Sequence, residues 1–317
     1  MNLEQLRGFV TIARVGHFTH AAEVLHLSQP SLSRQISTLE HDLGATLLNR
    51  TRGNLTLTAA GHALLPLATR MLADEESIRV EMAELAGLRR GRVRLGAPPT
   101  LCASLVAEVL ETYHVQFPGI ELQISEAGSR LLLEQLTGGQ LDLALIVTSE
   151  HAVTEPSLAH TELLVEQLVV ADSVQHPQLA DGPVDLRDLA RVPQITFSPS
   201  YDLRAATHKA YQALELTPNV VIDGGEMDAV LRFVQVGLGA AIVPATALVG
   251  RPEVQAKELR ASPAKDPRQV QPSLERTIGL AHRRDTPPGA AASAMHQLLV
   301  QTAGQLAQRH AQISLRS

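Results

Sequence analysis

Residues 27–44, LSQPSLSRQISTLEHDLG, carry hydroxyl, amide and guanidinium side chains on one side of an expected helix. Groups of these types hydrogen-bond to base edges in the major groove of DNA, and Arg pairs with guanine in particular. The alternative is an ordinary solvated helix face, but such faces are usually rich in Glu and Lys. The segment therefore predicts a surface that reads DNA. Its expected members are Gln29, Pro30, Ser31, Ser33, Arg34 and Ser37.

Two further arginines follow this helix in the sequence. Arg50 and Arg52 lie in residues 47–58, LLNRTRGNLTLT, which read as two short strands around a Gly–Asn turn. A hairpin of this kind can present both guanidinium groups to phosphates or to the minor groove. We expect it to act as a wing beside the reading helix.

The reading helix is the third of three short helices expected in residues 1–44. Asn2 and Gln5 resemble a capping box at the start of the first helix, Thr19 can cap the second, and Ser28 can cap the third. Gly44 ends the third helix. A helix, a tight turn and a second helix at this spacing form the helix-turn-helix arrangement, whose second helix enters the major groove. The apolar residues that should bury the other side of the reading helix are Leu32, Ile36, Leu39 and Leu43.

Residues 59–88 read as one long helix that begins after Thr58, a good N-cap. Its apolar residues recur at alternating spacings of four and three, the period of a coiled-coil seam, and only Glu75 interrupts them. The alternative is packing within one chain, but a small DNA-binding domain has too little surface to cover so long a seam. We therefore expect a dimer, whose two-fold symmetry suits paired DNA half-sites. The expected dimer residues are Leu64, Ala68, Met71, Ile78, Met82 and Leu85.

After Arg92, strand-like and helix-like segments alternate, which predicts parallel sheets covered by helices. The series occurs twice, so we expect two lobes with a cleft between them. The expected fold is a winged helix-turn-helix domain rich in α-helix, a long linker helix and a two-lobed α/β domain. The expected bounds are 1–58 for the DNA-binding domain, 59–90 for the linker and 91–317 for the two-lobed domain, with lobe I at about 91–164 and 270–317 and lobe II at about 165–269.

Segments that begin at Thr100, Ser129 and Ser200 each follow a strand and should expose helix N-termini. Free N–H groups at such ends favour a carboxylate, and ligands of α/β sheets bind beyond the carboxyl ends of the strands. The alternative for each hydroxyl is a plain N-cap. Together the three segments predict a site for a small-molecule effector, suited to a carboxylate, with no resident cofactor.

Composition argues against several other functions. A single cysteine, Cys102, leaves no internal disulfide and no Cys-rich zinc site, and we expect it to behave as a small buried hydrophobe. The 13 His show no metal-ligand spacing, and no catalytic motif stands out, so neither a metal nor an enzyme is expected. The net charge is −6, yet residues 1–60 hold five Arg against four acidic residues, so the DNA-binding part is near neutral. With no apolar run near the roughly 20 residues of a membrane span and no signal-peptide pattern, we expect a cytoplasmic protein that binds no membrane.

Residues 18–61, FTHAAEVLHLSQPSLSRQISTLEHDLGATLLNRTRGNLTLTAAG, closely resemble the LysR-type transcriptional regulators. The likeness continues more loosely through residues 117–146 and 230–244, so it covers nearly the whole chain. It implies a winged-helix DNA-binding domain, a linker helix and a two-lobed effector domain similar to periplasmic binding proteins. The DNA-contacting residues that it implies are Gln29, Pro30, Ser31, Ser33 and Arg34, with Arg50 and Arg52 on the wing.

The resemblance also implies partners: double-stranded promoter DNA, a small-molecule co-inducer, RNA polymerase, and further copies of the chain in a homodimer or homotetramer. Peroxide-sensing members of the family use a reactive Cys in the second lobe, and residues 198–208 hold none, so peroxide sensing is not expected. Two alternatives stay open: a cytoplasmic small-molecule-binding α/β protein whose N-terminal helices serve only assembly, and a regulator that needs no ligand. The residues that the resemblance implies for the co-inducer are Pro99, Thr100, Leu101, Ser129, Val147, Thr148, Phe197 and Ser198.

Overall fold

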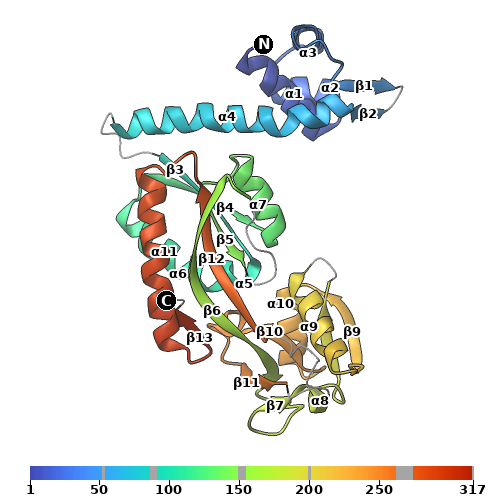
Figure 1. Ribbon diagram of the computed structural model, residues 1–317, viewed down its shortest axis with the longest axis vertical. Coiled ribbons are helices and arrows are strands. Elements are labelled where there is room, and N and C mark those ends of the chain that lie inside the picture. Colours follow the sequence, from blue (N-terminus) through green and yellow to red (C-terminus); the bar gives the residue numbers. More distant parts are fainter. Residues whose placement is uncertain (52–53, 86–90, 149–154, 199–200, 262–273, 316–317) are drawn as a thin grey trace.

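The computed structural model describes residues 1–51, 54–85, 91–148, 155–198, 201–261 and 274–315. They form a small N-terminal domain, a long helix and a two-lobed C-terminal domain that follow one another along the longest axis of the molecule (Figure 1). The long helix lies across the upper end of lobe I, and lobe II lies at the far end.

The N-terminal domain begins with the expected capping box, in which Asn2 and Gln5 each accept a hydrogen bond from the other's backbone N–H. Ser28 Oγ accepts from Ser31 N and caps the third helix, also as expected. The second helix starts at Phe18 and not after Thr19, because Gly16 turns the chain in the left-handed conformation and His17 becomes the extended N-cap. The elements are α1 (Leu3–Val15), α2 (Phe18–Val24), α3 (Gln29–Leu43), β1 (Leu48–Thr51) and β2 (Asn54–Leu57).

The three helices share one apolar core with the first turns of the long helix α4 (Ala59–Leu85). Leu32, Ile36 and Leu39 of α3 are fully buried in this core, as the sequence predicts. Leu43, expected on the same buried side, is 40% exposed, because it is the last residue of α3 and lies beyond the core. Thr58 Oγ1 accepts from Gly61 N at 3.0 Å and caps α4 as expected.

Lobe I contains a mixed sheet. Its strands β3, β4 and β5 run parallel to one another, and β12 runs antiparallel beside β5. The expectation of parallel sheets is therefore only partly right, because the chain returns into lobe I from the opposite direction through β12. The elements of lobe I are β3 (Gly91–Ala97), α5 (Pro99–Leu101), η1 (Cys102–Val106), α6 (Ala107–Gln116), β4 (Ile120–Glu126), α7 (Ser129–Thr137), β5 (Leu143–Val147), β12 (Glu275–Arg283), α11 (Ala290–Arg309) and β13 (Ile313–Leu315).

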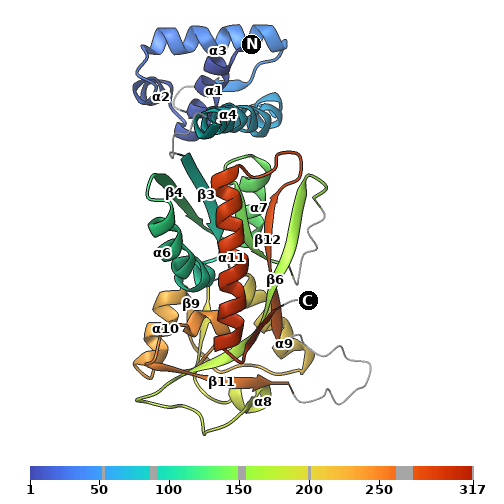
Figure 2. The ribbon, with the colours of Figure 1, turned by 90° about the vertical axis from the view of Figure 1, so that its left-hand side faces the viewer.

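A single long strand, β6 (Leu158–Ser173), runs through both lobes (Figure 2). Its first part pairs with β12, and its last part pairs with β10 and β11 of lobe II. The expected lobe boundary at residues 164–165 therefore falls inside a continuous strand. The elements of lobe II are β7 (Val184–Asp185), α8 (Leu186–Leu189), β8 (Gln194–Phe197), α9 (Asp202–Ala213), β9 (Val220–Gly225), α10 (Met227–Gln235), β10 (Ala241–Pro244), η2 (Ala245–Leu248) and β11 (Val254–Arg260).

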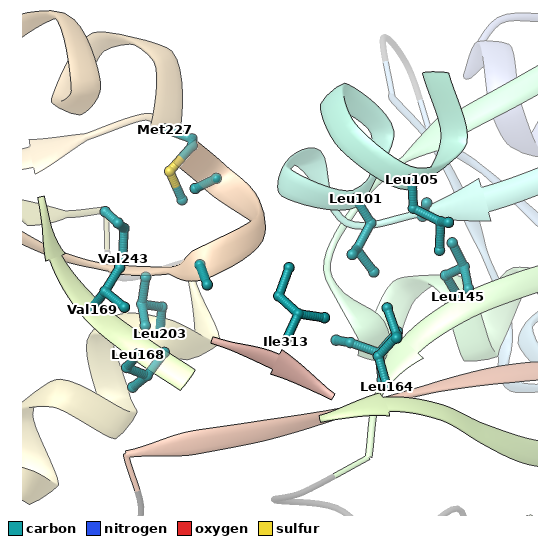
Figure 3. Packing of buried hydrophobic residues seen from close by; sticks show 14 of the residues in the cluster. Leu101, Leu105, Leu145, Leu164, Leu168, Val169, Leu203, Met227, Val243 and Ile313 are labelled. Carbon is teal, nitrogen blue, oxygen red and sulfur yellow. The ribbon is translucent and has the colours of Figure 1, made fainter. Parts of the chain in front are cut away.

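One apolar core extends from lobe I into lobe II along this strand. In Figure 3, Leu101 and Leu164 lie on the lobe I side, and Met227 and Val243 lie on the lobe II side. Ile313 of β13 lies between the two groups. Because the core is continuous, β6 and its neighbours hold the strand ends of both lobes close to one another.

Candidate nucleic-acid interface and ligand site

The polar side of α3 faces solvent. Among the six residues of the expected reading surface, five are exposed and Ser33 is half-buried. The opposite side of the same helix is buried against α1 and α2, so the rest of the domain does not cover the reading surface. The geometry leaves this helix available to enter a groove.

The residues of the reading surface differ in what their side chains already bond. Ser37 Oγ donates to Ser33 O at 3.0 Å. Thr38, the next residue along the helix, donates from its Oγ1 to Arg34 O, also at 3.0 Å. Both hydroxyls are thus turned back onto their own helix, although their oxygens can still accept hydrogen bonds. The guanidinium of Arg34, in contrast, bonds no other side chain in the described part of the chain, so its donors remain available.

A contact that sequence reasoning missed fixes α3 relative to the hairpin. Glu40 Oε1 accepts hydrogen bonds from Leu47 N at 2.9 Å and from Leu48 N at 3.3 Å. These are the backbone groups where the chain enters β1. The side chain of Glu40 therefore sets the position of the wing against the reading helix.

The expected wing is an antiparallel hairpin in which Leu48 pairs with Leu57 and Thr51 pairs with Asn54. Arg50 belongs to its first strand. The side chain of Arg50 and the whole of Arg52 lie outside what the structure describes, so their expected phosphate contacts stay predictions.

The expected dimer seam on α4 divides into two faces. Ala68 is fully buried in the core of its own domain, so its side chain is not available for a dimer contact. Leu64 is half-buried, and its expected dimer contact stays a prediction. Glu75, which interrupts the seam, forms an ion pair with Arg7 of α1 at 2.9 Å. The side chain of Leu85 lies outside the described residues. Among the described side chains of α4, the large apolar ones that are exposed are Leu67 (60%), Met71 (43%), Ile78 (60%) and Met82 (54%).

The expected effector residues of lobe I lie at the carboxyl ends of β3, β4 and β5. Thr100 is 4% exposed, and its Oγ1 accepts a hydrogen bond from Arg276 Nη2 at 2.7 Å. Ser129 is 8% exposed, and its Oγ accepts from Val147 N at 2.9 Å. Neither hydroxyl caps its helix, because Pro98 and Gly128 occupy the N-cap positions. The N-cap alternative therefore fails for both, and each links neighbouring elements at this edge.

Other expected effector residues have structural surroundings. Leu101 is fully buried and Phe197 is 3% exposed, both in the apolar core, so their side chains contribute no open surface. Thr148 N donates to Thr277 O at 2.8 Å, which ties the end of β5 to the start of β12. Pro99, Val147 and Ser198 are half-buried, and Ser198 N donates to Gly225 O at 3.1 Å. Ser200, expected to begin a helix, lies outside the described residues.

Tyr201 and Cys102 line the same region from opposite lobes, and neither ionises at neutral pH. Burial, followed by a hydrogen bond to Glu226, raises the pKa of Tyr201 to about 12. Burial, followed by the charge of Glu126, raises the pKa of the Cys102 thiol to about 12. Cys102 Sγ lies 3.6 Å from Ala97 O. Both groups therefore stay protonated, and Cys102 is a partly buried thiol packed against the core, without the lowered pKa of a nucleophilic cysteine.

Within the described residues, no three His, Cys, Asp or Glu side chains gather as a metal site would require. No helix in the described part of the chain combines the length and apolar character needed to cross a bilayer.

Two family models match the chain. Residues 3–62 match the bacterial regulatory helix-turn-helix protein, lysR family, and residues 86–304 match the LysR substrate binding domain. The first match removes the alternative in which the N-terminal helices serve only assembly, because it identifies them as a DNA-binding helix-turn-helix.

Known proteins that resemble the chain are transcriptional regulators. The chain is 31% identical over 281 residues, 89% of its length and 92% of the relative, to the uncharacterized HTH-type transcriptional regulator YybE of Bacillus subtilis. It is also 31% identical to a probable nitrogen assimilation transcriptional activator of Synechococcus elongatus, covering 78% of this chain and 80% of that one.

Solved structures show the same fold. A full-length OxyR variant from Pseudomonas aeruginosa superposes with a TM-score of 0.65 at 24% identity, covering 96% of this chain and 95% of that one. CbnR in complex with its target DNA superposes with a TM-score of 0.65 at 22% identity, and the match covers 95% of this chain and 100% of that one. With these matches, the exposed reading helix and the two-lobed domain, the chain belongs to the LysR family of bacterial transcriptional regulators, which bind DNA through an N-terminal helix-turn-helix and carry a C-terminal effector-binding domain.

Proposed function

We propose that this chain binds an operator as a homodimer or homotetramer and that a small molecule between its two lobes alters the binding. The observation that carries the DNA half of the proposal is the exposed polar side of α3, with the donors of Arg34 uncommitted. The neighbouring structure of CbnR bound to target DNA supports the same use of the helix. RNA polymerase is then the expected partner at the promoter, and the cytoplasm is where we expect the chain to act.

The structure supports a particular division of labour along the chain. We assign DNA recognition to residues 1–58, dimerisation to residues 59–90 and effector binding to residues 91–317. Helix α4 ends at Leu85 and β3 begins at Gly91, which favours these bounds. For the dimer contact we propose Leu67, Met71, Ile78 and Met82, because these side chains are exposed along one helix. Exposed apolar side chains of this kind are stabilised when a partner covers them.

For the effector, support comes from the carboxyl ends of β3, β4 and β5. Thr100 and Ser129 both lie at that edge, and β6 continues from lobe I into lobe II. Ligands of open α/β sheets bind beyond this edge. The effector residues that we retain from the sequence are Pro99, Thr100, Ser129, Val147, Thr148 and Ser198.

The test is an electrophoretic mobility shift with the DNA upstream of the chain's own gene. We expect a discrete shifted band at low salt that weakens steeply as salt rises, because phosphate contacts release counterions. A shuffled DNA of the same length is the matched control. Absence of retardation at low salt, or equal retardation of both DNAs, would contradict the proposal.

A further inference from the structure

Four polar side chains meet where β6 passes from lobe I to lobe II. Glu166 lies in β6 directly opposite Arg276 of β12 in the strand register. Two residues further along, Leu168 already pairs with Pro244 of lobe II. Thr100 of α5 and Thr246 of η2 complete the group, one from each lobe.

Short hydrogen bonds join the side chains of Thr100, Glu166 and Arg276 and the backbone N–H of Thr246. Glu166 Oε1 accepts from Arg276 Nε at 2.6 Å, and Glu166 Oε2 accepts from Thr246 N at 2.9 Å. Arg276 Nη2 donates to Thr100 Oγ1 at 2.7 Å. The carboxylate of Glu166 thus holds Arg276 on one side and lobe II on the other. We call Thr100, Glu166, Thr246 and Arg276 the junction.

The junction is largely withdrawn from solvent. Glu166 is fully buried, Thr246 is 1% exposed and Thr100 is 4% exposed, whereas the side chain of Arg276 keeps 14% of its surface. A buried ion pair is costly because both charges lose their hydration. Well-packed apolar residues often stabilise a buried contact as well as an ion pair does, so stability alone does not account for the two charges.

Several hydrogen-bond donors at the junction have no acceptor among the described residues. Thr246 Oγ1 is buried and finds no partner among the described residues, although buried hydroxyls are normally paired. The Thr100 hydroxyl accepts from Arg276, which leaves its own proton to donate. Arg276 uses Nε and Nη2, and no hydrogen bond from its Nη1 to a described residue is present. A guanidinium and two hydroxyls together match a carboxylate.

We propose that the junction is the carboxylate subsite of the effector site, where Arg276, Thr100 and Thr246 donate hydrogen bonds to a carboxylate group of the effector. Glu166 is a positioning residue that orients Arg276. Because Thr100 and Thr246 belong to different lobes, one bound carboxylate bridges the lobes. This inference rests on the proposed function, since it names the chemical class of the proposed effector.

Two carboxylates, Glu126 and Glu226, act on side chains close to Thr100 and bear on the class of ligand. Glu126 at the end of β4 acts on Cys102, two residues from Thr100, and on Tyr201 across the lobes, where Glu226 lies as well. A second carboxylate on the ligand would be repelled there. These two carboxylates favour an effector that carries a single carboxylate.

The test compares carboxylates with neutral isosteres on the full chain. Acetate and benzoate are the probes, acetamide and benzamide are their controls, and sodium chloride holds the ionic strength equal. We expect both carboxylates to raise the melting temperature and both amides to leave it unchanged. Equal effects of acid and amide, or no effect of either carboxylate, would overturn the proposal.

A double variant tests whether the Glu166–Arg276 pair serves carboxylate binding or only the stability of the fold. Glu166→Gln with Arg276→Gln removes both charges and leaves no buried charge unpaired. The matched control is Arg260→Gln, because Arg260 of β11 is exposed and lies outside the junction. We expect the double variant to fold and to lose roughly tenfold or more in carboxylate affinity, the range for losing a charged donor, while the control keeps it. Unchanged affinity in the folded double variant would show that the ion pair is only structural.

The same preparations also test the proposed function independently. The double variant should retard operator DNA in the absence of ligand, because the junction lies far from α3. Absence of DNA binding by the unsubstituted chain would count against the proposed function alone. Equal shifts of its melting temperature by carboxylates and amides would count against this subsite alone.

Discussion

Arg34 is the residue of α3 whose role the structure separates best from those of its neighbours. Its guanidinium is exposed and uncommitted within the described chain, whereas Ser37 and Thr38 donate their protons to carbonyls of their own helix. Sequence pattern alone placed Arg34 and Ser37 on the same surface and could not rank them. The hydroxyl rotors of α3 make the difference, and these depend on the local helix backbone.

We expect Arg34→Ala to cost about 1–3 kcal/mol of operator binding and to relax specificity at one base pair, as for a bidentate contact to a base. Ser37→Ala is the matched control and should cost much less, since its proton is already bonded to Ser33 O. Fluorescence anisotropy with single-base operator variants measures both. A uniform loss for every DNA sequence would show that Arg34 contacts phosphate and not a base.

Cys102 allows a prediction about redox chemistry. Because its pKa is raised to about 12, the thiol is protonated throughout the neutral range and its thiolate fraction is far below that of a free Cys. We therefore expect iodoacetamide at pH 8 to label the folded chain orders of magnitude more slowly than the same chain in urea. Mass spectrometry measures the labelled fraction. Equal rates in the folded and unfolded chain would contradict the burial that raises this pKa.

At the scale of elements, the sequence predicts the helix caps, whose partners are close in the chain, but not the ion pairs between distant residues. The capping box of α1 and the caps of α3 and α4 follow from residues three apart, so spacing reveals them. Arg276 and Glu166 are 110 residues apart, and only the pairing of β6 with β12 brings them together. The same holds for Arg7 with Glu75, which explains why Glu75 appeared only as an interruption of the α4 seam.

The split of that seam leads to a prediction about assembly. We expect Ile78→Glu to dissociate the oligomer, because Ile78 is 60% exposed and a charge there cannot be covered by a partner helix. Ala68→Glu should instead unfold the N-terminal domain, since Ala68 is fully buried in that domain's own core. Sedimentation velocity and circular dichroism distinguish the two outcomes. An unchanged sedimentation coefficient for a folded Ile78→Glu chain would remove α4 as the dimer contact.

At the scale of the whole molecule, ionic contacts join the linker helix to lobe I. Arg283 Nη2, at the end of β12, donates to Asp74 Oδ1 of α4 at 2.6 Å. Arg70 of α4 also pairs with Asp285. Strand β12 thus begins at the junction with Arg276 and ends against the helix that carries the DNA-binding domain. No local sequence pattern indicates this contact, because its partners come from different domains.

The Asp74–Arg283 pair can be tested for its effect on domain arrangement. Arg283 is only 7% exposed and its Nη1 has no partner among the described residues, so Asp74→Asn leaves a buried charge with less compensation. We expect this variant to weaken the contact by about 1–2 kcal/mol, less than for a fully buried pair because Asp74 is itself 41% exposed. Hydrogen exchange of the middle of α4 should then become faster, while that of α1 stays unchanged.

Glu76→Gln is the matched control, because Glu76 contacts Arg92 at 3.8 Å and the two side chains keep 47% and 28% of their surface. A pair that long and that exposed contributes little, so exchange in α4 should stay at the level of the unsubstituted chain. If Asp74→Asn and Glu76→Gln behave alike, the linker helix is held to lobe I by its other contacts. If only Asp74→Asn frees the helix, β12 forms a continuous physical link from the effector site to the linker helix that positions the DNA-binding domain.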